Sequence, residues 1–247
     1  MSLTESQVVP YRDVDVEGVR NGFATSSSTN VVEFSSVVPD SAFSRISLPG
    51  KRALDIVGAL IGLVVFAPLF LVIFLLVRRD GGPALFKHKR VGRDGKEFEM
   101  LKFRSMIVNA EEMVDKIIAN DPVRRAEWLE THKFSDDPRV TKIGDFLRRK
   151  SFDELPQLWN VLRGDMSLVG PRPIGLDEVV KYGPAYTKFI SVRPGLTGLW
   201  QVNGRNDLAY QEKVALDVAY LSNLSWSNDV RILFRTVLVV LLERGAR

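Results

Sequence analysis

Two adjacent carboxylates, Asp153 and Glu154, directly follow the basic run at 148–150 and are the clearest candidates for chemistry in this sequence. An Asp-Glu pair at the start of a helix is well placed to handle a phosphate and a metal ion. Ser151 and Glu154 have the spacing of a capping box, and Pro156 fits only near the first turn of a helix. The pattern predicts a helix that begins at Ser151, whose dipole lowers the pKa of Asp153 and keeps it ionised. A capped, solvated helix start without chemistry explains the same pattern.

Arg172 is a second candidate, because Pro171 and Pro173 hold it on stiff backbone. An arginine with few alternative conformations loses little entropy on binding, which suits a clamp on a phosphate. A rigid surface turn is the alternative. Residues 193–205 form another basic, loop-rich stretch. Lys102 and Arg104 follow a strand pattern, for which a solvated strand face is the plain explanation.

Composition restricts the classes of site. A chain of 247 residues can bury one sizeable core, or one domain with appendages. It has no cysteine, which excludes disulfides, thiolate catalysis and zinc–sulfur sites. The two histidines, His88 and His132, are too few for a histidine-rich metal site and are predicted to lie on the surface.

Charge is unevenly distributed. Residues 1–50 contain three Lys/Arg and six Asp/Glu, although the whole chain has a net charge of +4. The remainder is therefore strongly basic and suggests an anionic partner: nucleic acid, a lipid surface or a phosphorylated substrate. Residues 1–48 show no persistent apolar period and are predicted to be a flexible tail, with no pattern of a cleaved signal peptide.

Residues 56–77 form a stretch of 22 residues without a charge, enough for about 33 Å of helix. Pro68 lies inside it, where proline kinks or breaks a helix. Basic pairs flank both ends, at 51–52 and 78–79, so the distribution of positive charge gives no direction of insertion. A re-entrant helix at 49–80, with both ends cytoplasmic, and a spanning helix both fit. A buried soluble helix fits less well, because it would rarely be apolar all round.

The fold class predicted is α+β and mostly helical, with a catalytic domain at 81–247 that carries a small β-hairpin and interfacial amphipathic helices. The hairpin is expected from strands at 84–91 and 96–103 around the Gly92–Gly95 turn. Apolar periodicity predicts a helix through Ile107–Ile118, and Asp121-Pro122 predicts the start of another. Further helices are expected at 143–150 and 230–242, the last docked on the core or the membrane interface.

Several functions are excluded or disfavoured. The chain has no P-loop, no dinucleotide-binding glycine fingerprint, no H-E-x-x-H motif and no internal repeat. A nucleic-acid-binding protein would interleave basic residues with aromatics along one face, whereas here they lie beside carboxylates and prolines. A membrane scaffold would need no Asp-Glu pair. A membrane-associated nucleotide-sugar pyrophosphatase or phosphatase that uses the Asp-Glu pair is the enzymatic alternative to the transferase that the resemblance described next implies.

Taken together, the motifs resemble the bacterial sugar transferase family, the monotopic phosphoglycosyl transferases that start exopolysaccharide and glycan assembly on a polyprenyl phosphate. The matching blocks are KRALD at 51–55, KFRSM at 102–106, DPRVT at 137–141, FDELPQLWNV at 152–161, GDMSLVGPRP at 164–173 and the stretch at 193–205. The resemblance covers about residues 50–245 and is closest to minimal members without an extra N-terminal transmembrane bundle. Ala67-Pro68 departs from the Ser-Pro found at the kink of some members.

The resemblance implies a polyprenyl-phosphate hexose-1-phosphate transferase. Asp153 would attack the sugar-bearing phosphate of a UDP-sugar and release UMP, and undecaprenyl phosphate would take the sugar phosphate from the aspartyl intermediate. Asp153 and Glu154 would be catalytic and would hold Mg²⁺, which prefers one or two carboxylates with substrate phosphates. The phosphate-binding residues implied are Lys102, Arg104, Arg139, Arg148, Arg172 and Arg205. The protein is expected to be monotopic in the bacterial inner membrane, in contact with its lipids, with the catalytic domain facing the cytoplasm. No nucleic-acid partner is expected, and a homodimer is left open.

Overall fold

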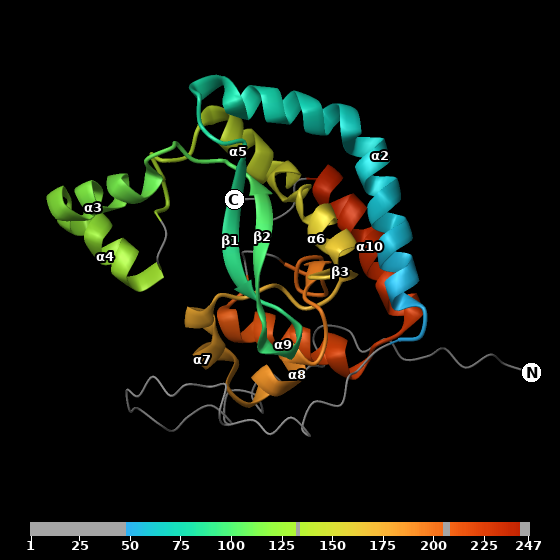
Figure 1. Cartoon of the computed structure of the whole chain (residues 1–247). Helices are drawn as coiled ribbons and strands as arrows, with labels where there is room; N and C mark the ends of the chain where they lie inside the picture. Colours follow the sequence, from blue (N-terminus) through green and yellow to red (C-terminus); the bar gives the residue numbers. More distant parts are fainter. Residues whose placement is uncertain (1–47, 132–133, 205–207, 243–247) are drawn as a thin grey trace, which may run out of the picture.

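The computed structural model describes residues 48–131, 134–204 and 208–242 (Figure 1). The predicted tail, except for Leu48, lies outside these ranges, as do His132 and Arg205. The described chain is mostly helical with one antiparallel hairpin, which confirms the predicted secondary-structure content.

The apolar stretch forms one long helix, α2 (Lys51–Val77), of 27 residues. It continues into a short 3-10 turn at Arg78–Asp80, and together they are long and apolar enough to cross a membrane. Pro68 lies inside α2, and Figure 1 shows the helix bending part-way along its length. The prediction of a kink is therefore confirmed, since proline removes one backbone hydrogen bond and its ring crowds the preceding turn. The re-entrant topology stays a prediction.

The predicted hairpin is confirmed. Strand β1 (Leu85–Val91) pairs antiparallel with β2 (Glu97–Phe103), in the register Leu85↔Phe103 to Val91↔Glu97. Its turn contains Asp94 and Gly95, both at positive φ, a conformation that glycine adopts without strain. The alternating residues Phe98 and Met100 of β2 are buried.

Two helices, α3 (Ala110–Asn120) and α4 (Pro122–Thr131), project from the body on the side away from α2 (Figure 1). Asp121 joins them, and its carboxylate accepts hydrogen bonds from the backbone N–H groups of Val123 and Arg124 at 3.0 and 3.1 Å. This confirms the helix start predicted at Asp121-Pro122. This projecting segment, called the α3–α4 excursion below, comprises residues 110–131, and the chain returns to the body at α5 (Lys142–Arg149).

The C-terminal half packs around a small parallel pair of strands that the sequence did not predict. Strand β3 (Ser167–Val169) pairs with β4 (Gly195–Thr197). The helices of this half are α6 (Gln157–Arg163), α7 (Val179–Tyr182), α8 (Tyr186–Ile190), α9 (Tyr210–Ser222) and α10 (Trp226–Leu241). Helix α10 thus extends the predicted helix at 230–242 toward the N-terminus by one turn.

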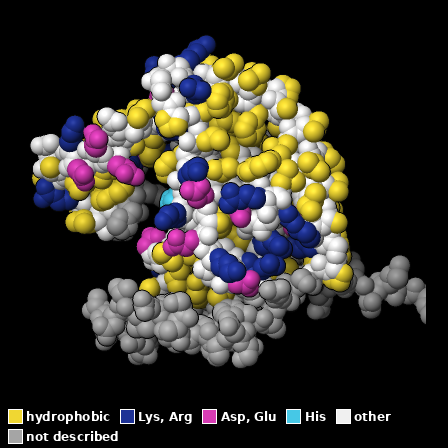
Figure 2. All heavy atoms as spheres, viewed as in Figure 1, with side chains coloured by type: hydrophobic (Ala, Val, Ile, Leu, Met, Phe, Trp, Pro, Cys, Tyr) yellow, Lys and Arg dark blue, Asp and Glu magenta, His cyan; other side chains and the backbone are white. Residues whose placement is uncertain are grey.

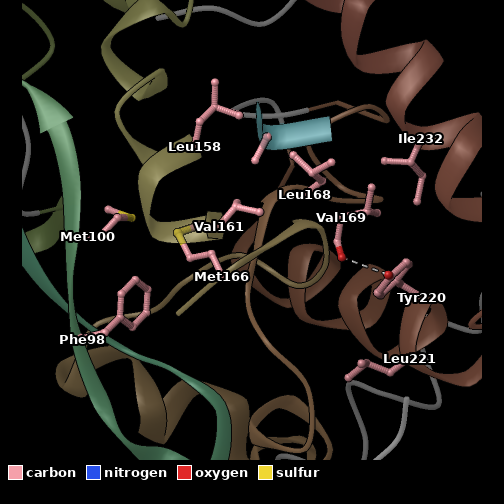
Figure 3. Close-up of a cluster of buried hydrophobic side chains, with 11 residues drawn as sticks. Phe98, Met100, Leu158, Val161, Met166, Leu168, Val169, Tyr220, Leu221 and Ile232 are labelled. Carbon is pink, nitrogen blue, oxygen red and sulfur yellow. Dashed lines mark hydrogen bonds between the residues drawn. The ribbon is translucent and has the colours of Figure 1, made fainter. Parts of the chain in front are cut away.

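The main core joins these elements. Figure 3 shows Phe98 and Met100 of β2 facing Leu158 and Val161 of α6, with residues of β3, α9 and α10 on the other side. The hydroxyl of Tyr220 donates a hydrogen bond to the carbonyl of Val169 at 3.2 Å. Helix α2 closes this core from outside.

Two glycines allow α2 to approach. A Cβ atom at Gly58 would lie 2.5 Å from a methyl group of Leu168, and one at Gly62 would lie 3.1 Å from Leu158. The opposite side of α2 is exposed, including Val64 and Val65. One side of the helix therefore belongs to the protein core, and the other is an exposed apolar surface.

Candidate active site

The turn that presents Asp153 and Glu154 lies between α5 and α6. The side chain of Thr141 accepts a hydrogen bond from the N–H of Gly144 at 2.9 Å and so caps α5. A Cβ atom at Gly144 would lie 1.9 Å from the carbonyl oxygen of Ser105, so only glycine lets α5 lie this close to the end of β2. Ser151 then adopts a left-handed conformation, with φ of 56°, and reverses the chain.

The predicted capping box at Ser151 is wrong. Residues Phe152–Glu154 form one 3-10 turn, and the serine side chain makes no capping hydrogen bond to it. Helix α6 starts later, with Pro156 as its N-cap. The left-handed backbone at Ser151 separates it from the helix, because an N-cap residue normally takes an extended conformation.

Asp153 is buried, with 8% of its surface exposed. Burial raises the pKa of Asp153 to about 6, and the neighbouring charge of Glu154 acts in the same direction. The charges of Lys102 and Arg148 oppose the increase. The expectation of a pKa lowered by a helix dipole is therefore wrong, since α6 begins four residues beyond Asp153 and desolvation is the larger effect.

Lys102 brings a positive charge to both carboxylates from the facing strand β2. Its Nζ lies 2.9 Å from Oε1 of Glu154 and 3.7 Å from Oδ2 of Asp153. Buried Asn160 of α6 fixes the distance between strand and turn. Its side chain accepts a hydrogen bond from the N–H of Leu101 at 2.9 Å and donates one to the carbonyl of Glu99 at 2.7 Å. The amide therefore continues the ladder of β2 and holds Lys102 over Asp153 and Glu154, which together are called the dyad below.

Arg148 approaches the dyad from the end of α5. Its Nε donates a hydrogen bond to Oγ of Ser105 at 2.9 Å, and its charge lowers the pKa of Asp153. Within the described ranges its two terminal nitrogens make no hydrogen bond, so they are available to an anion beside Asp153. The structure thus brings three of the predicted residues, Lys102, Arg148 and Glu154, to Asp153.

Arg172 belongs to a neighbouring cluster organised by Glu178, which the sequence did not identify. Nη1 of Arg90 lies 2.7 Å from Oε1 of Glu178, and Nη1 of Arg172 lies 3.3 Å from Oε2. The hydroxyl of Tyr210 donates a hydrogen bond to Oε2 of Glu178 at 3.1 Å. One carboxylate therefore holds two guanidinium groups close together despite their mutual repulsion.

His88 lies between this cluster and the dyad. Partial desolvation of its ring lowers the pKa of His88, although the residue as a whole is exposed, and the charges of Arg90, Lys102 and Arg172 lower it further. Nη2 of Arg90 is 3.3 Å from its Nδ1. Basic side chains of both clusters are therefore close enough to act on the same imidazole ring. His88 is exposed, as predicted, but no motif in the sequence links it to Asp153.

Two other predicted phosphate ligands are engaged elsewhere. Arg104 is buried, and all five of its N–H groups donate hydrogen bonds, two to Asp80 and three to carbonyl oxygens of Val77, Pro83 and Met106. In this arrangement it fastens the end of α2 to the hairpin and has no donor left for a substrate.

Arg139 lies at the base of the α3–α4 excursion. It forms a bidentate pair with Asp137, at 2.8 and 2.6 Å, and its guanidinium group lies over the rings of Trp128 and Phe134. These contacts anchor the excursion to the body. The prediction for Arg205 lies outside the described residues.

The donor set suits Mg²⁺ only in combination with a substrate. Within the described ranges, no group of three or more His, Cys, Asp and Glu side chains is arranged to hold a metal ion. Asp153 and Glu154 supply two carboxylates. Mg²⁺ commonly binds through one or two carboxylates, with substrate phosphates and water as its other ligands. The residues present therefore fit an ion that arrives with a phosphorylated substrate.

Comparison with known proteins gives a consistent result. The family model described as bacterial sugar transferase matches residues 46–243. The UDP-galactose-lipid carrier transferase of Erwinia amylovora is 50% identical over 196 residues, which cover 79% of this chain and 41% of the relative. The undecaprenyl-phosphate galactose phosphotransferase of Salmonella typhimurium gives the same identity and coverage. The exopolysaccharide production protein ExoY of Rhizobium meliloti is 45% identical over 197 residues, which cover 87% of its length. The chain thus spans less than half of the first two relatives and most of the third.

Proposed function

The chain belongs to the bacterial sugar transferase family. We propose that it transfers a sugar 1-phosphate from a UDP-sugar to a polyprenyl phosphate and releases UMP. Relatives named as UDP-galactose-lipid carrier transferase and undecaprenyl-phosphate galactose phosphotransferase support the reaction class. The exopolysaccharide production protein supports a role in exopolysaccharide production.

The observation that carries the proposal is the burial of Asp153 beside Lys102 and Arg148. A buried carboxylate with a pKa of about 6 is ionised at neutral pH and is more basic than an ordinary aspartate. One of its oxygens forms a bond to the sugar-bearing phosphorus, and the bond from that phosphorus to the bridging oxygen breaks. The bridging oxygen leaves with UMP. Lys102 and Arg148 offset the negative charge that carboxylate and diphosphate bring together.

The second half of the reaction returns the enzyme to its starting state. An oxygen of polyprenyl phosphate attacks the same phosphorus, and the bond to Asp153 breaks.

The apolar side chains around the dyad support access of a membrane lipid to Asp153. Phe152 and Leu155 flank the dyad and pack against a cluster that includes Ile73 and Val77 of α2. The turn with Asp153 is therefore joined directly to the C-terminal part of the apolar helix.

Glu154 and Asp153 would hold Mg²⁺ together with the substrate phosphates. When bound, the ion would neutralise phosphate charge and so make attack by a carboxylate easier. Glu154 is also the partner of Lys102, and keeps that ammonium group between the two carboxylates. Arg172, held by Glu178, would bind a phosphate of the nucleotide through its outer N–H groups.

The proposed location is the bacterial inner membrane, with α2 re-entrant and the dyad facing the cytoplasm. The exposed apolar side of α2, the bend in the helix and the basic residues at both of its ends support this topology. Arg104 ties the C-terminal end of α2 to the hairpin through Asp80. A helix that returned to the same side would keep both ends attached to one catalytic domain.

The direct test measures UMP release by the purified full-length chain over a panel of UDP-sugars, with and without polyprenyl phosphate. We expect one sugar to be preferred and net turnover to require the lipid. Formation of free sugar phosphate or inorganic phosphate without lipid would instead identify a pyrophosphatase or phosphatase. Relatives named for galactose and glucose make UDP-galactose and UDP-glucose the first substrates to compare.

A further inference from the structure

A second basic site lies at the opposite end of the hairpin from the dyad. A cavity of about 280 Å³ opens at the start of α2, and four basic side chains line it: Lys51, Arg52, Arg93 and Arg193. Figure 2 shows Lys and Arg side chains gathered in this region, between the hairpin turn and the N-terminal part of α2. None of the four has a role in the proposed transfer reaction.

Carbonyl oxygens near the end of α6 orient two of these side chains. Arg52 donates hydrogen bonds to the carbonyls of Val161 and Leu162 at 2.6 and 2.8 Å. Nε of Arg193 donates to the carbonyl of Gly164 at 2.7 Å. Carbonyl groups fix the direction of a guanidinium group but leave its full charge in place. The two arginines are therefore held rigid and still charged.

Carboxylates neutralise only part of the charge in the cavity. Lys51 pairs with buried Asp229, but Arg93 has only a long contact of 3.6 Å with its neighbour Asp94. Burial lowers the pKa of Arg193, and the charges of Arg93 and Arg52 lower it further, whereas the charges of Asp55, which also lines the cavity, and Asp94 raise it. Within the described ranges, the terminal nitrogens of Arg93 and Arg193 make no hydrogen bond. An anion with several acceptor oxygens would satisfy these donors and relieve the repulsion.

The position of the cavity indicates where the anion would come from. Gly50 precedes α2 in a left-handed conformation, and Trp226, the first residue of α10, packs against it. From this point both helices carry exposed apolar side chains, such as Ile61 on α2 and Phe234 on α10. Tryptophan is enriched at membrane–water interfaces. The cavity therefore lies where two lipid-facing surfaces begin, at the level that a lipid headgroup would occupy.

The cavity is too far from the dyad to hold the acceptor substrate. Arg93 is in the hairpin turn, whereas Lys102 lies along β2 toward the other end of the hairpin. Within β2 alone, the five steps from Glu97 to Lys102 span about 17 Å at the usual rise of a strand, and Arg93 lies beyond Glu97 in the turn. A phosphate bound at Arg93 would be out of reach of Asp153, so an anion here would serve a different purpose.

We propose that this cavity binds the phosphate group of an anionic membrane phospholipid and fixes the start of α2 at the membrane surface. The phosphate oxygens accept hydrogen bonds from Arg93 and Arg193, and the acyl chains lie against the exposed sides of α2 and α10. A net negative lipid is favoured because the cavity holds more positive than negative side chains. The inference does not depend on the sugar-transfer reaction.

The test titrates the purified full-length chain, in a neutral detergent, with short-chain phosphatidylglycerol and measures binding by calorimetry. Short-chain phosphatidylcholine and inorganic phosphate are titrated in parallel. We expect saturable binding of phosphatidylglycerol at least about tenfold tighter than of either comparison compound, and Arg93→Gln should weaken it about tenfold. Arg193→Gln should have a similar effect. Arg149→Gln, at an exposed arginine of α5 that pairs with Asp145, is the matched control and should bind normally.

Two results would overturn the proposal. Equal affinity for phosphatidylglycerol and phosphatidylcholine, or unchanged binding in Arg93→Gln, would show that the cavity does not select an anionic lipid. Inorganic phosphate that binds as tightly and displaces the lipid would identify a soluble phosphate as the ligand. Arg93 makes no bond to another element within the described residues, so Arg93→Gln should fold normally, which thermal melting would verify.

Discussion

Lys102 and Glu154 form an ion pair across the gap between β2 and the catalytic turn, with 2.9 Å between Nζ and Oε1. The same ammonium group is 3.7 Å from Asp153 and is the strongest influence that opposes the raised pKa of Asp153. We therefore predict that Lys102→Gln raises the pKa of Asp153 above about 6. The acidic limb of the pH profile for UMP release should move to higher pH, in addition to a lower maximal rate.

Lys87→Gln provides the control for this change. Lys87 lies on β1, is exposed and pairs with Glu99 on the same hairpin. Its replacement should leave the pH profile unchanged. A Lys102→Gln enzyme that lost rate without any shift of the acidic limb would show that Lys102 does not act on the ionisation of Asp153.

The ionised, buried carboxylate of Asp153 should lower the free energy of unfolding at neutral pH. Its pKa is raised from 3.8 to about 6, so the folded state binds the proton more tightly than the unfolded state does. The resulting stabilisation is complete below about pH 4 and is lost as the pH rises through about 6. Asp153→Asn has no carboxylate to desolvate and should be more stable than wild type at pH 7.5, by up to about 3 kcal/mol.

Thermal melting at several pH values measures this effect. The advantage of Asp153→Asn should be large at pH 7.5 and much smaller at pH 4.5. Asp145→Asn, at an exposed position, is the control and should show no comparable trend. An advantage that did not change with pH would contradict the raised pKa.

Local signals account for the elements predicted correctly. The hairpin follows from glycines in its turn and alternation in β2, and α4 follows from an aspartate cap before a proline. The bend in α2 follows from Pro68. Each of these depends on residues that are neighbours in sequence, so the sequence contains the cause.

The features that were predicted wrongly from the sequence, or were not predicted, depend on contacts between distant segments of the chain. The pKa of Asp153 depends on burial and on Lys102, which lies 51 positions earlier and approaches only after β2 and α6 pack together. Glu178 gathers Arg90, Arg172 and Tyr210 from three separate parts of the chain. Arg104 matched a family motif, but its five hydrogen bonds to the end of α2 and the adjoining loops could not be read from that motif.

Arg172 should be sensitive even to a conservative change. Arg172→Lys keeps the charge but removes the planar fork that binds a phosphate through two hydrogen bonds. We expect a loss of about 2–3 kcal/mol in transition-state stabilisation, or roughly 30- to 150-fold in kcat/KM. Glu178→Gln should reproduce part of the loss, because it releases Arg172 and Arg90. Wild-type kinetics for Arg172→Lys would leave the proline-flanked turn with only a structural role.

The topology can be tested by cysteine labelling, because the chain has no native cysteine. Single cysteines at Ser27 and Asp94 lie on opposite sides of α2 in the sequence. A re-entrant α2 would keep both in the cytoplasm, so both should be protected from an impermeant reagent in intact cells and react after lysis. Labelling of only one of them in intact cells would mean that α2 spans the membrane.

The proposed reaction requires Asp153 to become covalently attached to the phosphosugar. A covalent intermediate predicts ping-pong kinetics, with exchange of labelled UMP into UDP-sugar in the absence of lipid. Asp153→Asn keeps the shape of the side chain but removes its charge, so activity should fall by at least about 10³-fold. Glu154→Gln should also reduce activity severely, while Asp145→Asn should not.

Mass spectrometry of enzyme quenched after mixing with UDP-sugar and Mg²⁺ would detect this intermediate. We expect a sugar-phosphate adduct on the peptide that contains Asp153; the adduct should be absent from Asp153→Asn and should disappear when polyprenyl phosphate is added. An adduct on another residue, or an Asp153→Asn enzyme that retains activity, would contradict it.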